Sequence, residues 1–91
     1  MEKEKIISLI AEDMKHNQLL NGLESIGLSD NDRYVLSLDL FIAQLMGHDR
    51  GKIPDAWLDR YQQTMLTIPF NLTPKEIHRR AIILFESLST I

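Results

Sequence analysis

The chain has 91 residues, with 10 Lys and Arg against 13 Asp and Glu, 44% hydrophobic residues and no cysteine. This length and apolar fraction predict a single folded domain over residues 1–91 and exclude a disordered chain. Without cysteine there are no disulfides, thiolate metal sites or cysteine nucleophiles. The charged start Met1 to Lys5 is unlike a signal peptide, and the longest apolar-rich run, residues 34–46, is too short for a membrane span. We therefore expect a soluble, cytoplasmic protein.

The first predicted helix begins near residue 3 and extends to about residue 16. Its apolar residues recur at the three-and-four spacing of one helix face: Ile6, Ile7, Ile10 and Met14. Two later signals compete to end it, Asn21-Gly22 and Gly27, because glycine accepts the left-handed conformation that ends helices. Either the helix continues to Leu20, or it breaks near Asn17 and a short second helix follows over residues 17–26. We favour the break.

One acidic residue interrupts the apolar face of this first helix. On a helical wheel Asp13 lies between Ile6 and Leu9, inside the apolar stripe. We interpret it as the point where the stripe leaves the core.

The next predicted helix, residues 30–46, is apolar nearly all round. Ser29 and Asp32 have the spacing of a capping box and place its start near Asp30. One stripe is formed by Tyr34, Leu38, Phe41 and Leu45 and is widened by Val35, Ile42 and Met46. The opposite side is also apolar, with Leu36, Leu40 and Ala43. A helix of this kind is buried. It is expected either at the centre of the bundle or with its second face closing a dimer.

Residues 54–67 form the third strongly periodic segment, after a polar loop with two glycines at residues 47–52. Its apolar stripe contains Trp57, Tyr61, Met65 and Ile68. Aromatic residues at a spacing of four suit either a core or an interface. We favour core burial for Trp57 and Tyr61.

The last helix has the strongest local start signal in the chain. Thr73 is the expected cap, Pro74 stands at the first helical position, and Glu76 completes a capping box. No segment shows sustained strand alternation. The sequence therefore predicts an all-α, compact bundle of four to five helices with a central, nearly all-apolar helix at about residues 30–46.

No set of residues predicts catalysis, a metal site or a cofactor. His16 has carboxylates within one turn of its helix but lacks the further ligands that a zinc site needs. His48-Asp49 lies in a loop with glycines on both sides, where turn chemistry explains it. We expect a protein that is not an enzyme.

Surplus apolar residues predict a protein partner or self-association. Ile83 is expected on the outside of the last helix, Ile82 leans off its core stripe, and Leu36 and Leu40 provide a second apolar face on the helix at 30–46. Large exposed apolar patches mark interaction sites. The leading hypothesis is a small interaction module with a regulatory, inhibitory or accessory role, which binds another protein or forms a homodimer.

The alternative hypothesis is a nucleic-acid-binding domain that uses the last helix. Basic side chains gather there, with Lys75 and Arg79 on one face, His78 nearby and Arg80 to the side. Phosphate binding depends on summed positive charge, whereas the whole chain has a net charge of −3. Nucleic acid is therefore the less favoured partner.

Overall fold

Four α-helices make up most of the part of the chain that the structure describes. The structure is a computed structural model that describes residues 2–23 and 31–91, with the side chains of residue 23 and of 31–37 left out. The helices are α1 (Lys3–Leu23), α2 (Asn31–Leu45), α3 (Asp55–Leu66) and α4 (Pro74–Ser89), and a short 3-10 helix, η2 (Arg50–Lys52), precedes α3. No strand occurs in these ranges. The predicted all-α bundle is confirmed, with four helices.

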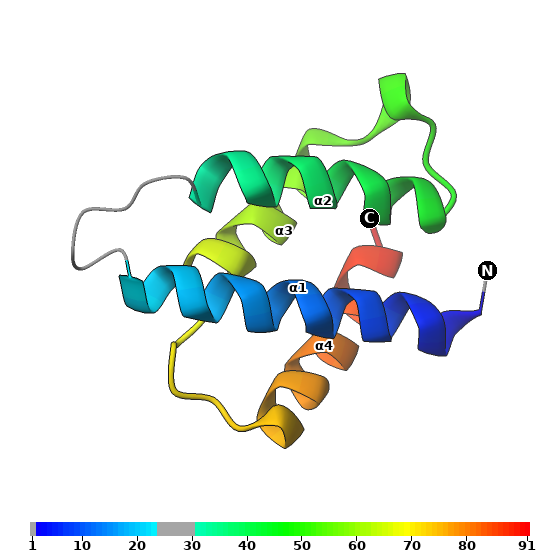
Figure 1. The fold of residues 1–91 in the computed structure, drawn as a ribbon. Helices are drawn as coiled ribbons and strands as arrows, with labels where there is room; N and C mark the ends of the chain where they lie inside the picture. The colour runs from blue at the N-terminus through cyan, green and yellow to red at the C-terminus, as the bar shows by residue number, and fades with distance from the viewer. Residues whose placement is uncertain (1, 24–30) are drawn as a thin grey trace.

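The long helix α1 runs beside α2, and α3 and α4 cross behind this pair, α3 behind α2 and α4 behind α1 (Figure 1). Helices α1 and α3 each contact all the other α-helices, whereas α2 and α4 make no contact with each other over the described residues. The central position expected for residues 30–46 is therefore not confirmed, because α2 lies on one side of α1. None of the described helices has the length and apolar character needed to cross a membrane.

The favoured break near Asn17 is wrong, because α1 continues through this residue to Leu23. Asn17 is fully buried, and its side-chain amide donates back along the same helix to the Asp13 carbonyl at 2.8 Å. Further along, the Asn21 amide donates to the carbonyls of Met65 at 3.1 Å and Ile68 at 2.9 Å. These bonds attach the last turn of α1 to the end of α3. The remainder of the alternative second helix, residues 24–26, lies outside the described residues.

One apolar core joins all four helices. Trp57 and Tyr61 are both 0% exposed, and their rings stack with centroids 5.4 Å apart and planes 4° from parallel. The interpretation of this pair as core residues is confirmed. The other buried apolar residues are Ile6, Ile7, Ile10, Ala11, Met14, Ile42, Ala43, Met65, Ile68, Ile77, Ala81, Leu84 and Leu88.

The buried face of α2 differs from the predicted stripe. Phe41 is 47% exposed, whereas Ile42, Ala43 and Asp39 are buried. The expectation of a helix buried nearly all round is thus wrong at Phe41, whereas Ile42 beside the stripe and Ala43 on the opposite side are buried as that expectation implies. The proposed cap at Ser29 and Asp32 lies outside the described part of the chain.

The predicted start of α4 is confirmed in its local chemistry. Thr73 caps the helix by accepting from the Glu76 backbone N–H at 3.2 Å, and its own hydroxyl donates to the Glu76 carboxylate at 2.9 Å. Pro74 occupies the first turn. This cap fixes the first turn of α4 and thereby places the residues that follow beside α3.

Candidate functional site

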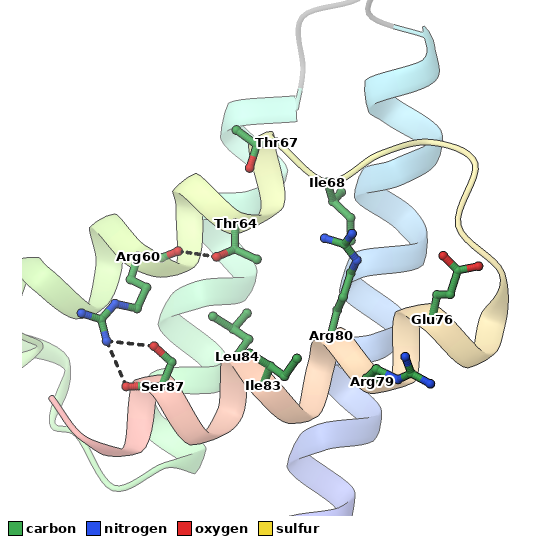
Figure 2. A pocket seen from close by; sticks show the side chains of 10 residues that line it. All are labelled: Arg60, Thr64, Thr67, Ile68, Glu76, Arg79, Arg80, Ile83, Leu84 and Ser87. Carbon is green, nitrogen blue, oxygen red and sulfur yellow. Dashed lines mark hydrogen bonds between the residues drawn. The ribbon is translucent and has the colours of Figure 1, made fainter.

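An open groove of about 550 Å³ lies between α3 and α4 (Figure 2). Helix periodicity creates its walls: residues three or four positions apart share a helix face, and the stripe next to the core stripe faces this groove on each helix. The α3 side provides Arg60, Thr64 and Thr67, with Ile68 just after the helix. The α4 side provides Glu76, Arg79, Arg80, Ile83, Leu84 and Ser87.

The groove combines a buried apolar floor with an exposed apolar rim. Ile68 and Leu84 are each 4% exposed and belong to the core, so they form a fixed floor. Ile83 is 62% exposed and stands on the α4 rim. An apolar side chain placed in the groove would therefore contact packed core atoms below and cover Ile83 at the side.

Three arginines and one glutamate make the groove positive. Arg60 donates from Nη1 to the Ser87 carbonyl at 3.1 Å and to the Ser87 hydroxyl at 2.9 Å, so it joins α3 to α4 at one end. Arg79 and Arg80 are exposed and have no carboxylate at ion-pair distance within the described residues, where the one ion pair joins Lys15 to Glu12. Figure 2 shows the Arg80 side chain extending away from α4, in the direction of Thr67 and Ile68.

Of the four apolar residues predicted for partner binding, the structure describes the side chains of Ile83, Ile82 and Leu40. Ile83 lines the groove, but Ile82 is half-buried and packs against the core. Leu40 is half-buried on α2, which does not contact α4 in the described ranges. The side chain of Leu36 lies outside the described residues. Partner binding by these four residues therefore stays a prediction.

The four basic residues predicted for the alternative function are also divided. Arg79 and Arg80 line the groove, whereas Lys75 and His78 are exposed on α4 outside its lining. The structure thus places two of the four predicted basic residues, Arg79 and Arg80, in the same groove as Ile83. Arg60 was not predicted as a site residue, although the polar residues Arg60, Thr64 and Thr67 recur at helical spacing beside the aromatic stripe.

A second polar cluster is buried where α1, α2 and α3 meet. Asp13 is 3% exposed, so its interpretation as the end of the apolar stripe is wrong. Its carboxylate accepts from the Asn17 amide at 2.8 Å and from the Tyr61 hydroxyl. These two donors explain how an acidic side chain is accommodated among apolar neighbours.

Asp39 of α2 is buried in the same region, but its carboxylate has fewer hydrogen-bond donors than that of Asp13. It is 0% exposed, and neither of its carboxylate oxygens has a hydrogen-bond partner among the described residues. The Gln62 side chain and the Leu40 backbone N–H lie near enough to favour the ionised form, but outside hydrogen-bond geometry. Asp39 is therefore the less compensated of the two buried acids.

Burial raises the pKa of both acids. Desolvation raises the pKa of Asp13 to about 6, against the opposing effect of its bonds from Tyr61 and Asn17. Desolvation likewise raises the pKa of Asp39 to about 6, and the negative charge of Asp13 adds to this rise while Gln62 and the Leu40 amide oppose it. Burial is thus the main cause of the raised pKa at both acids, and the charge of Asp13 adds a smaller rise at Asp39.

The buried acids do not make a metal centre of the usual kind. Within the described residues no group of three or more His, Asp or Glu side chains is placed to hold a metal ion. The groove between α3 and α4 is the stronger candidate for a binding site, because its charged side chains are exposed to an incoming ligand.

Comparisons with known proteins gave no match. No protein-family model matches this chain, and neither a curated protein nor a solved structure does. A functional interpretation of the groove therefore depends on its own geometry and charge.

Proposed function

We propose that this chain is a protein-binding module whose α3–α4 groove holds a partner segment with both acidic and apolar side chains. The observation that carries the proposal is the pairing of a buried apolar floor with three arginines, two of which have no carboxylate partner among the described residues. Guanidinium groups form bidentate hydrogen bonds with carboxylates, and arginine is enriched at interface hot spots. The role is a regulatory, inhibitory or accessory one in the cytoplasm, without catalysis by the chain itself.

The dimensions of the groove favour a helical segment as the occupant. The α4 wall runs from Glu76 to Ser87, which is three helical turns and about 16 Å. An amphipathic helix of that length would add its apolar stripe to the floor formed by Ile68 and Leu84, in the helix-in-groove mode of recognition. Acidic residues beside this stripe would face Arg79 and Arg80.

Selection from a displayed library of helical peptides tests the proposal directly. We expect enrichment of peptides that combine apolar residues at helical spacing with adjacent Asp or Glu. For a synthetic peptide from that selection, Arg79→Glu with Arg80→Glu should weaken binding at least tenfold in fluorescence anisotropy, because two attractive pairs become repulsive. Ile83→Asp should weaken it by placing a charge on the apolar rim.

Lys75→Glu is the matched control, because Lys75 is exposed on the same helix but outside the groove lining. It makes the same charge change as either groove substitution alone and should alter the affinity less than threefold at physiological salt. Equal losses from the control and the groove variants would indicate a non-specific charge effect and contradict the proposal. A library that yields no enriched acidic peptide would also contradict it.

Self-association is the alternative occupant of the same groove. Light scattering coupled to size exclusion, at tens of micromolar chain, should show a monomer if the partner is a different protein. A dimer that Ile83→Asp converts to a monomer would instead place a second copy in the groove.

Nucleic acid is the second candidate, favoured by Arg60, Arg79 and Arg80 standing in one groove. The apolar floor and the chain's net charge of −3 count against it. We expect no anisotropy change with labelled duplex or single-stranded DNA or RNA at low salt. Binding that weakens steeply with salt and is lost with Arg79→Ala and Arg80→Ala would favour nucleic acid over a protein segment.

A further inference from the structure

Two carboxyl groups are buried at the junction of α1, α2 and α3 with no cationic partner in the described part of the chain. Asp13 has two neutral donors, whereas both oxygens of Asp39 lack a hydrogen bond. An ionised carboxylate that is buried without a partner is costly, and two such charges near each other repel. When both carboxyls are ionised, Asp13 of α1 and Asp39 of α2 therefore destabilise the packing of these two helices.

An outward movement of helix α2 would reduce this destabilisation. The helix carries Asp39, and over the described residues it contacts α1, α3 and η2 but not α4, so an outward movement of α2 would break no contact of α4. A hollow of about 410 Å³ also separates part of α2 from α1, with Asp13, Leu38, Phe41 and Ile42 among its lining residues. Moving α2 outward would hydrate Asp39 and Asp13 while leaving the packing of α4 on α1 and α3 in place.

We propose that α2 is a proton-controlled flap: it stays docked on α1 and α3 while protons neutralise Asp13 and Asp39, and it opens when both carboxyls are ionised. The opened state exposes the apolar surface that Ile42 and Ala43 cover in the docked state. The inference goes beyond the binding groove, whose walls on α3 and α4 do not include α2.

The charged groups around the pair do not neutralise it. On α1, Glu12, Lys15 and His16 line the mouth of the hollow, and Lys15 is paired with Glu12 at 3.5 Å. On α3, Tyr61 donates to Asp13, and the acidic residues Asp55 and Asp59 are exposed. Before α3, His48 is in edge-on contact with Trp57. The side chains of Asp32 and Arg33 on α2 lie outside the described residues. The pKa of about 6 for each acid places the change between pH 5 and 7.5.

Amide hydrogen exchange on the full chain tests the flap. The protection factors of amides in residues 38–45 of α2 and in residues 77–88 of α4 are compared at pH 5.0 and 7.5. We expect the α2 amides to be less protected than the α4 amides at both pH values, because α2 opens without global unfolding. Their protection should fall by about tenfold to a hundredfold at the higher pH, which is the loss that two such pKa changes produce.

Asp39→Asn should remove at least half of this fall on a logarithmic scale, whereas Asp59→Asn, at an exposed position of α3, should leave it unchanged. Equal protection of α2 and α4, with the same dependence on urea, would show that only global unfolding exposes α2 and would overturn the proposal. Protection of α2 that does not change with pH would overturn it as well. Both decisive comparisons use the natural sequence, so they stand even where Asp39→Asn fails to fold.

Discussion

The buried hydrogen bond from Tyr61 to Asp13 couples an aromatic core residue to an ionisable one. The two residues are 48 positions apart in the chain, and Tyr61 also stacks on Trp57. Tyr61 therefore both packs in the core and donates a hydrogen bond to a buried carboxylate. Hydrogen bonds to a charged group contribute more than those between neutral groups, so this bond is worth more when Asp13 is ionised.

Tyr61→Phe should destabilise the fold by about 1.5–3 kcal/mol at pH 7.5, because it keeps the ring and removes only the hydroxyl donor. The loss should be smaller at pH 4.5, where the pKa of about 6 leaves Asp13 mostly protonated. Urea unfolding at the two pH values measures both numbers. An equal loss at both would contradict the role of the hydroxyl as a donor to the ionised carboxylate.

Helix α1 contains a glycine that its backbone conformation does not require. Gly22 lies within it at a negative φ, and a Cβ added there would meet the Phe70 side chain at 3.4 Å, an ordinary contact. Gly47 is different, because its φ of 97° is one that L residues adopt only with strain. The backbone conformation therefore requires a glycine at position 47 but not at position 22.

Gly22→Ala should therefore stabilise the protein by up to about 1 kcal/mol, because alanine favours a helix more than glycine does. Gly47→Ala should destabilise it by about 1 kcal/mol or more. Chemical unfolding of the two variants beside the natural chain measures the difference. A destabilising Gly22→Ala would indicate that α1 ends earlier than Leu23.

The start of α4 is set by local chemistry instead. Thr73→Ala removes the acceptor of the Glu76 backbone N–H and the donor to its carboxylate, and should cost about 1 kcal/mol. Thr90→Ala, at the opposite end of the helix, removes a hydroxyl that bonds the Ser87 carbonyl and should cost less than about 0.5 kcal/mol. Thermal unfolding of both variants separates the cap from a general effect of losing a surface threonine.

At the scale of the whole molecule, the two buried acids set the pH dependence of stability. A folded-state pKa of about 6 lies above the ordinary value of 3.8. The stability that each acid contributes is thus fully present below pH 3.8 and is lost as the pH rises through 6. We expect the free energy of unfolding to be about 1–3 kcal/mol lower at pH 7.5 than at pH 5.0.

Urea unfolding between pH 5.0 and 7.5 measures this slope. Asp39→Asn should make it shallower, and Asp59→Asn should leave it as it is. A free energy of unfolding that rises over this range would mean that the acids are ionised and stabilised in the fold, contrary to their burial.

The division between what was predictable from sequence and what was not follows the range of the interactions. The cap of α4 was predictable because Thr73, Pro74 and Glu76 act within one turn, and the core position of Trp57 and Tyr61 followed from helical spacing. The continuity of α1 was not, because Asn21 bonds carbonyls more than 40 positions away. The groove could not be predicted without knowing that α3 lies beside α4. For this reason Arg60 was not predicted as one of its lining residues.

The stacked Trp57–Tyr61 pair also makes the molecule its own optical probe. The chain contains one tryptophan, and its ring lies parallel to the phenol that bonds the Asp13 carboxylate. A change in the charge of that carboxylate therefore reaches the indole through a single intervening ring. Intrinsic emission, without any attached label, should follow the proton on Asp13 in the folded protein as well as report its unfolding.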